Sequence, residues 1–302
     1  MMIYPPYLKL GNTIGIVCPS GYMPIQRVQK AIEIIKQWGF EVKLGKTVGH
    51  QHHYFSGTDA ERLQDVQSML DDPSIDAILC GRGGYGLSKI IDAIDFSSFI
   101  KNSKWIVGFS DITLLQAHLY TQYHISTIHG AMAGAFEDYG VESATIQSLY
   151  NVLMGKKMHY TSSPHPFNKN GIATGNLVGG NLTMLAHSIG TASDIEYNNC
   201  ILCIEDVGEY IYNIDRMMVQ LKRSGKLKRL QGLIVGGFTD MKDTTIPFGC
   251  SVYEAIQHII SDFDFPVCFD FPISHSEQNV AFKYGALCTL EVNSSKVFLK
   301  EL

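Results

Sequence analysis

The sequence predicts an α/β protein with two domains: an N-terminal open parallel sheet with flanking helices, and a second mixed, β-rich, barrel-like domain. Its 302 residues exceed what a single hydrophobic core usually organises, which favours two domains. The first half alternates short apolar runs with helical patterns, as a parallel sheet with crossover helices requires. The composition changes near residues 150–175, and short strand-like runs follow it. This change indicates a second domain of different construction.

In the first domain, each strand-like run is followed by a helical pattern. Apolar residues between Gln26 and Trp38 recur at helical spacing until Gly39 ends the pattern. Thr58 and Glu61 have the spacing of a capping box, which predicts a helix start there. The expected strands are Gly15–Pro19, Phe40–Leu44, Ala77–Cys80 and Lys104–Gly108, and the expected helices are Gln26–Trp38, Thr58–Leu70, Leu87–Ile94 and one that begins just past Ser110.

The domain boundaries follow from composition. Residues 1–155 are expected to form the α/β domain, and residues 175–302 the second domain. Residues 156–174, which include the Pro164 and Pro166 region, read as a linker. The expected strands of the second domain are Gly175–Gly180, Cys200–Ile204, Gly232–Gly237, Val267–Phe269 and Ala286–Val292, and its expected helices are Asn181–Ile189, Ile214–Ser224 and Tyr253–Ile260.

Bulk properties exclude several classes of protein. A formal net charge of -5 does not favour binding to nucleic acid, which is itself negatively charged. The basic stretch Lys222–Arg229 is interpreted as the solvent-exposed end of a helix. Seven cysteines, several inside apolar runs, are typical of buried reduced thiols in the cytoplasm. The sequence shows neither a secretory leader nor an apolar stretch of membrane-spanning length, so we expect a cytoplasmic protein without membrane partners.

Ser110 is the first candidate for chemistry. A buried-looking strand ends at Gly108 and a helix begins just after Ser110, which would present the hydroxyl at the tip of a tight turn. The amide of Asp111, at a helix N-terminus, could stabilise a developing negative charge. Ile112 stands where the usual nucleophile-elbow pattern has a second glycine. A helix cap made by the side chain of Ser110 or Asp111 explains the same spacing.

A glycine-rich loop, Gly81–Gly86, comes after another strand-like run. Its spacing matches neither the dinucleotide fingerprint nor the Walker A motif, so nucleotide binding is weakly supported. Such a loop can turn backbone amides toward an oxyanion, or it can simply be a tight turn between strand and helix.

A serine nucleophile needs a base and an orienting acid. Among the histidines, His275 is the best base, because it lies in a loop after a strand-like run. Glu205 and Asp206 end the apolar run before them; Glu205 is the better orienting acid, since Asp206 could cap the next segment of the chain. Among the other histidines, His50, His52 and His53 are expected in a polar surface loop, His118 is expected to be structural, and His129 is expected to support the site.

Taken together, these motifs resemble the serine LD-carboxypeptidases, the group that includes muramoyl-tetrapeptide carboxypeptidase and the microcin-immunity peptidases. The resemblance covers nearly the whole chain. The matching segments are Ile16–Ser20, Arg82–Gly86, Gly108–Thr113, His129–Gly130, Gly179–Leu182, Glu205–Glu209, Asp215–Met217 and Ser274–His275.

The resemblance implies a site. It makes Ser110 the nucleophile, His275 the general base and Glu205 its orienting partner. It also implies an oxyanion hole formed by the amides of Asp111 and Gly84. Gly83 and Arg82 are then expected to contact substrate, although Arg82 could instead buttress the loop. This chain departs from the family at Ser274, where glycine is common, and at Phe109, where tyrosine is frequent.

The implied activity is hydrolysis of a terminal D-amino acid, D-alanine, from an L,D-linked murein tetrapeptide in cell-wall recycling. No metal or other cofactor is expected, and the partners implied are a small peptide with a D-terminus and a second copy of the chain. Two alternatives stay open: a microcin-immunity-type peptidase acting on a peptidyl-nucleotide, and a catalytically silent protein that binds a small ligand.

Overall fold

The computed structural model describes residues 2–302, and the chain divides into two compact units. Unit 1 comprises the residues up to Lys156 together with the short segment Val280–Lys283. Unit 2 comprises Lys157–Asn279 and Tyr284–Leu302. No helix of the described residues is both long enough and apolar enough to cross a membrane.

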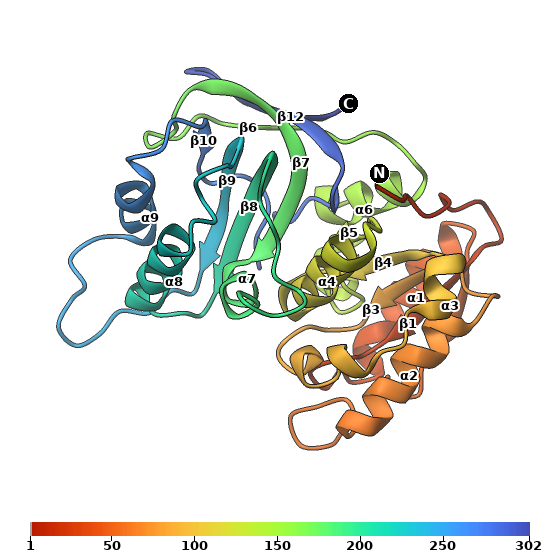
Figure 1. Ribbon diagram of the computed structural model, residues 1–302. Coiled ribbons are helices and arrows are strands. Elements are labelled where there is room, and N and C mark those ends of the chain that lie inside the picture. Colours follow the sequence, from red (N-terminus) through yellow and green to blue (C-terminus); the bar gives the residue numbers. More distant parts are fainter. Residues whose placement is uncertain (1) are drawn as a thin grey trace. The chain divides into compact units, whose positions relative to one another are not determined.

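Unit 1 is built on a six-stranded sheet, of which β1 to β5 lie in the red-to-yellow part of the chain in Figure 1. The strand order is β11-β5-β4-β3-β1-β2, and every pair is parallel except β11 with β5. The parallel sheet predicted for the first half is therefore confirmed. The strands are β1 (Thr13–Val17), β2 (Glu41–Leu44), β3 (Ala77–Cys80), β4 (Trp105–Gly108), β5 (Ile128–His129) and β11 (Phe282–Lys283).

Helices cover both faces of this sheet. On one face, Ile14, Leu79 and Val107 of the strands pack with side chains of α1, α5 and α6. On the other, Ile78 and Ile106 belong to a buried cluster with α2, α3 and α4. The helices are α1 (Gln26–Gln37), α2 (Asp59–Asp71), α3 (Ser97–Lys101), α4 (Thr113–Tyr123), α5 (Ala135–Tyr139) and α6 (Ala144–Leu153).

The helix expected over Leu87–Ile94 is instead two 3₁₀ turns, Leu87–Lys89 and Ile91–Ala93. The buried residues of this segment include Leu87, Ile90 and Ile94. Leu87 and Ile90 lie three residues apart, the repeat of a 3₁₀ turn, but Ile94 follows after four residues. The same pattern therefore also fits an α-helix, and the sequence could not distinguish the two. In contrast, the capping box at Thr58 is present and begins α2 as expected.

Unit 2 contains a seven-stranded mixed sheet in the order β10-β9-β8-β7-β12-β13-β6. The ladders from β10 to β7 are parallel, and those from β7 to β6 are antiparallel. The predicted mixed sheet is confirmed; it is an open sheet in which no ladder between β6 and β10 closes a barrel within residues 2–302. The strands are β6 (His159–Ser162), β7 (Gly171–Asn181), β8 (Cys200–Val207), β9 (Gly232–Thr239), β10 (Val267–Cys268), β12 (Leu287–Val292) and β13 (Val297–Glu301).

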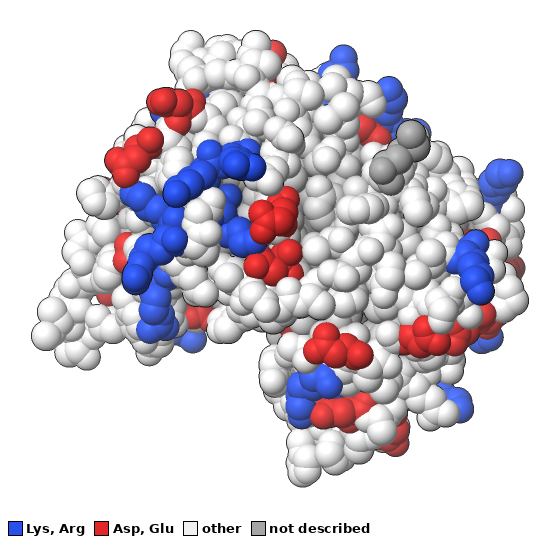
Figure 2. Space-filling view, viewed as in Figure 1, with Lys and Arg blue, Asp and Glu red and all other residues white. Residues whose placement is uncertain are grey.

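Three helices accompany this sheet, α7 (Leu182–His187), α8 (Ile211–Arg223) and α9 (Val252–Ile260). Figure 2 shows Lys and Arg side chains gathered over α8, where the basic stretch Lys222–Arg229 ends the helix. Lys222 and Lys226 form ion pairs with acidic side chains of the same unit. The stretch is thus a solvated, partly neutralised helix end.

Two segments differ from the expected domain boundaries. The expected linker 156–174 contains strand β6, which pairs with β13, and the beginning of β7, which pairs with β12. Residues 280–283, expected in the second domain, leave unit 2 and pair with β5 through β11. Strands β6 and β11 are short and carry little apolar pattern of their own, and the first residues of the longer β7 are mostly exposed or half-buried. Partners distant in sequence define these segments as strands.

Candidate active site

The turn after β4 has the geometry of a nucleophile elbow. Ser110 has a φ of 62°, a left-handed conformation that is uncommon for a residue with a side chain. It opens a short 3₁₀ segment, Ser110–Ile112, that leads directly into α4. A Cβ atom on Gly108 would lie 2.9 Å from side-chain carbons of Ile112, so this position requires glycine. Ile112, the residue that breaks the usual motif, therefore packs onto Gly108.

The structure rules out a helix cap by Ser110 or Asp111. Neither the 3₁₀ segment nor α4 has a side-chain cap at its N-terminus. The buried Asp111 carboxylate instead accepts hydrogen bonds from Ser20 Oγ at 2.6 Å and from the Leu87 amide at 2.9 Å. Burial raises the pKa of Asp111, although both hydrogen bonds oppose the change. Asp111 thus ties the elbow to two loops of the same sheet edge.

The glycine loop lies against the elbow. A Cβ atom on Gly83 would lie 2.9 Å from Ser110 Cβ, 3.0 Å from Ser110 Oγ and 3.3 Å from the Asp111 amide nitrogen. Gly84 has a φ of 95°, and a Cβ there would lie 2.5 Å from the Tyr54 hydroxyl. The loop needs both glycines, one for close approach to the serine and one for its backbone conformation.

Arg62 is a supporting residue that the sequence analysis missed. Although it lies in α2, its side chain is fully buried. Its guanidinium donates to the carbonyl oxygens of Pro19 and Gly86, pairs with Asp59 and lies 4.9 Å from the centre of the Phe55 ring. Arg62 therefore connects the loop after β1 to the glycine loop. A charged residue in a helix reads as exposed from sequence, so no sequence signal identified it.

We expect Arg62→Met to destabilise the protein by about 3 kcal/mol, because it leaves two buried carbonyl oxygens without their donor. Urea unfolding measures the change. Lys89→Met is the matched control: Lys89 pairs with the same Asp59 and lies over the same Phe55 ring, but it is exposed. Loss of an exposed ion pair should cost under about 1 kcal/mol. Equal losses in the two variants would contradict this role of Arg62.

Arg82 is exposed at the same loop. Its Nη1 donates to the Tyr22 carbonyl oxygen at 2.8 Å, and none of the ion pairs among residues 2–302 involves it. By contrast, Arg27 on α1 pairs with both Glu137 and Asp138. Arg82 is therefore a cation beside the elbow that no carboxylate of the described chain neutralises.

In unit 2, the buried Glu205 pairs with the half-buried His275. Glu205 lies near the C-terminal end of β8 and is 0% exposed, whereas the His275 side chain is 15% exposed. His275 Nδ1 lies 2.5 Å from Glu205 Oε2. Because a carboxylate only accepts, Nδ1 carries the proton, and the tautomer leaves Nε2 as the basic nitrogen. The structure brings these two residues together as the sequence analysis predicted.

The electrostatics of the pair suit a general base. Burial alone would lower the pKa of His275, but the Glu205 carboxylate, through its charge and its hydrogen bond, together with Asp206, outweighs burial and raises the pKa. Asp206 has a different role from Glu205. It accepts hydrogen bonds from Asn181 and from the amide and hydroxyl of Thr183, at the start of α7.

Two glycines near the C-terminal end of β9 leave room for the loop that carries His275. A Cβ atom on Gly236 would lie 2.1 Å from the Ile273 carbonyl oxygen, and one on Gly237 would lie 2.6 Å from Ser274 Cβ. The Gly237 amide also donates to that Ile273 oxygen at 2.9 Å. Ser274 replaces the glycine common in the resembling family, and its hydroxyl contacts Ser276 Oγ at 2.6 Å and the Gln278 carbonyl oxygen at 2.9 Å. The departure from the family pattern thus adds hydrogen bonds within the loop.

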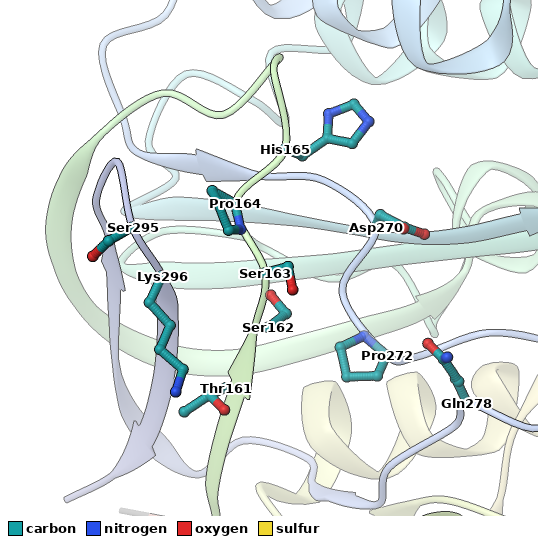
Figure 3. Close-up of a pocket in the computed structure, with 10 residues that line it drawn as sticks. All are labelled: Thr161, Ser162, Ser163, Pro164, His165, Asp270, Pro272, Gln278, Ser295 and Lys296. Carbon is teal, nitrogen blue, oxygen red and sulfur yellow. The ribbon is translucent and has the colours of Figure 1, made fainter.

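The loop that carries His275 also borders a polar pocket of about 500 Å³ (Figure 3). Asp270, Pro272 and Gln278 of this loop face the end of β6, the residues just after it and the turn before β13. The lining is mostly hydroxyl, amide and charged groups. The pocket residues are Thr161, Ser162, Ser163, Pro164, His165, Asp270, Pro272, Gln278, Ser295 and Lys296.

The other five histidines considered in the sequence analysis occupy other environments. His50, His52 and His53 are exposed in a loop. His118 packs against Phe96, with ring centres 5.5 Å apart, and burial lowers its pKa. His129 in β5 stacks on Phe282, with ring centres 4.5 Å apart. Within residues 2–302, no three His, Cys, Asp or Glu side chains gather so that they could hold a metal ion.

Comparisons with known proteins identify the family of this chain. A family model described as the LD-carboxypeptidase N-terminal domain matches residues 14–130, and one described as the LD-carboxypeptidase C-terminal domain matches residues 174–290. Together the two models match more than half of the chain.

Curated relatives and solved structures give the same result. The probable murein peptide carboxypeptidase of Bacillus subtilis is 33% identical over 93% of this chain and 89% of its own length. The crystal structure of muramoyltetrapeptide carboxypeptidase from Oxalobacter formigenes has a TM-score of 0.87 and 28% identity, over 96% of this chain and 98% of that one.

The Microcin C7 self-immunity protein MccF of Escherichia coli is also similar, at 24% identity over 97% of this chain and 94% of its own length. Its structure in complex with aspartyl sulfamoyl adenosine has the same fold, with a TM-score of 0.87 and 23% identity over 99% of each chain. The two domain models and the Bacillus relative show that this chain is a hydrolytic carboxypeptidase and belongs to the LD-carboxypeptidase family.

Proposed function

We propose that the protein is a serine LD-carboxypeptidase that removes the terminal D-alanine from an L,D-linked murein tetrapeptide in cell-wall recycling. Ser110 is the nucleophile, His275 the general base and Glu205 its orienting partner. The observation that carries the proposal is the pairing of His275 with Glu205, in a chain that also holds Ser110 in a left-handed elbow. The names of the Bacillus and Oxalobacter proteins support the murein peptide as substrate.

Chain connectivity supports a joint role for the two units. Only residues 276–279 separate His275 from Val280, where the chain enters unit 1. There β11 pairs with β5, and β5 pairs with β4, the strand that ends at Gly108 just before the elbow. A short covalent tether therefore connects the proposed base to the sheet that carries the proposed nucleophile.

In the proposed reaction, His275 Nε2 accepts the proton of Ser110 Oγ while the oxygen attacks the carbonyl carbon of the L,D-peptide bond. The amides of Asp111 and of the Gly83–Gly84 loop hold the oxyanion. The imidazolium returns the proton to the leaving amine, D-alanine departs, and an acyl-enzyme remains. A water molecule, deprotonated by His275, then hydrolyses the acyl-enzyme and regenerates Ser110.

Arg82 supplies the recognition that defines a carboxypeptidase. We propose that its guanidinium binds the terminal carboxylate of the substrate, because Arg82 lies beside the elbow and no carboxylate of the described chain pairs with it. Gly83 contacts the scissile end of the same peptide.

Arg82→Met is expected to raise KM for the tetrapeptide by about 10- to 100-fold, the effect of losing a charge-assisted contact. Steady-state kinetics measures this change. Lys30→Met is the control, because Lys30 is an exposed cation of α1 that pairs with Glu33. If KM were unchanged in Arg82→Met, the carboxylate would be bound elsewhere.

The decisive assay compares three candidate substrates under the same conditions. The proposal requires D-alanine release from an L,D-linked tetrapeptide and none from a matched peptide that ends in L-alanine. The similarity to MccF motivates the third substrate, aspartyl sulfamoyl adenosine, the compound bound in that solved structure. Hydrolysis of this compound with no activity on the tetrapeptide would favour the microcin-immunity alternative and overturn the murein assignment.

We further propose that the enzyme is a cytoplasmic homodimer, as its family resemblance implies. Sedimentation equilibrium tests the assembly directly: the mass expected is twice the 33.6 kDa of one chain. A single species at the monomer mass across micromolar concentrations would contradict the dimer.

A further inference from the structure

A cavity of about 480 Å³ opens in unit 1 at the carboxyl ends of the parallel strands. Its walls come from the segments after four of them: Met23 after β1, Gly81 after β3, Phe109 after β4 and Met132 after β5. Parallel sheets bind their ligands at this edge. The cavity also adjoins the elbow along the chain, because Phe109 precedes Ser110.

The walls suit an apolar side chain beside a carboxylate. Met23 and Met132 are flexible and polarisable, and Phe109 and Tyr139 add aromatic surface. Arg82 also lines the cavity and is not neutralised by any carboxylate among residues 2–302.

The other charged groups of the lining balance each other. Arg27 pairs with Asp138, and both side chains line the cavity. Arg27 also pairs with Glu137, outside the lining, so Arg82 is the lining cation that no carboxylate among residues 2–302 pairs with.

The size of the cavity indicates how large a side chain it can accept. A volume of about 480 Å³ lies within the range of small-molecule binding sites, roughly 300 to 1,000 Å³. The side chain of D-alanine is a single methyl group and would leave most of this space unfilled. The cavity therefore has room for a residue with several more carbon atoms.

We propose that this cavity receives the side chain of the leaving residue, and that the enzyme also releases D-amino acids with large apolar side chains, such as D-methionine, D-leucine and D-phenylalanine. This inference rests on the proposed function, because it uses the same hydrolysis: the L,D-peptide bond breaks, water adds across it and the free D-amino acid departs. Arg82 holds the carboxylate of the leaving residue while Met23 and Met132 adapt to its side chain.

The test uses four tetrapeptides that differ only at the last residue, which is D-alanine, D-methionine, D-leucine or D-phenylalanine. We expect kcat/KM for the D-methionine and D-leucine peptides to equal or exceed that for the D-alanine peptide. The filling variant is Ala135→Leu, at the half-buried first residue of α5, where leucine is a good helix former. It should lower kcat/KM for the three larger residues at least tenfold and change that for D-alanine by less than about threefold.

Ala144→Leu is the matched control. It makes the same substitution at the first residue of the next helix, α6, on an exposed position outside the cavity. Kinetics with all four peptides should be unchanged. In addition, free D-methionine should inhibit D-alanine release by the wild-type enzyme more strongly than L-methionine does, a measurement that needs no variant.

The outcomes separate the two proposals. Release of D-alanine alone, with no inhibition by D-methionine, would overturn this inference and leave the proposed function intact. Equal losses for all four peptides in Ala135→Leu would show that the cavity does not receive the leaving side chain. Failure of the wild-type enzyme to release any D-residue from an L,D-linked peptide would overturn the proposed function itself.

Discussion

Ser110→Ala and Ser110→Gly are both expected to lower kcat for D-alanine release by at least about 10⁴-fold, as the loss of a catalytic serine does in other serine hydrolases. The two variants should differ in stability. Ser110 has a φ of 62°, which strains any residue with a Cβ atom, so alanine keeps the strain and glycine relieves about 1 kcal/mol of it. Activity assays and urea unfolding of both variants measure the two effects.

The pair of variants makes the test strict. An inactive Ser110→Gly that is at least as stable as the wild type cannot be explained by misfolding, so the loss must come from the missing hydroxyl. Wild-type turnover in either variant would show that Ser110 is not the nucleophile. Ser20→Ala is a useful comparison, because Ser20 bonds to Asp111 in the same unit but has no role in the proposed reaction.

Much of unit 1 could be predicted because its signals are local. Strands β1, β3 and β4 are short apolar runs, each with a helical pattern after it in the sequence, and the capping box of α2 can be recognised from four residues. The elbow could be recognised too, because Gly108, Ser110 and the start of a helix lie within one short segment. The resemblance then predicts that His275 and Glu205 act together with Ser110, and His275 Nδ1 does lie within hydrogen-bond distance of Glu205.

The features that the sequence could not reveal depend on partners far along the chain. Arg62 looks like a surface charge of an amphipathic helix until the loops after β1 and β3 surround it. Strand β11 has two residues, and only its pairing with β5 identifies it as a strand of unit 1. The roles of Glu205 and Asp206 were distinguished by their order in the strand, but hydrogen bonds to α7 and to His275 are what separate them.

Glu205→Gln is expected to lower kcat by about 10⁴-fold, the effect of the corresponding carboxylate-to-amide change in the Ser-His-Asp triad. An amide can donate to Nδ1, which would place the imidazole proton on Nε2, where it cannot serve as the base. Asp206→Asn is the control, since it removes the neighbouring carboxylate but leaves the bond between Glu205 and His275. The kcat of Asp206→Asn should stay within about tenfold of the wild type, because Asp206 acts on the His275 imidazole only through its negative charge.

The pH dependence gives a second, independent test of the same pair. His275 must be unprotonated to act as the base, and the Glu205 carboxylate raises its pKa, so kcat/KM of the wild type should fall as pH drops through that raised value. In Glu205→Gln the charge and the carboxylate hydrogen bond are lost while burial, which lowers the pKa, remains. In Glu205→Gln, the pH at which kcat/KM falls on the acid side should therefore be lower than in the wild type, even though the maximum value of kcat/KM is also lower. A fall that stays at the same pH, or moves to higher pH, would mean that the titrating group is not His275 paired with Glu205.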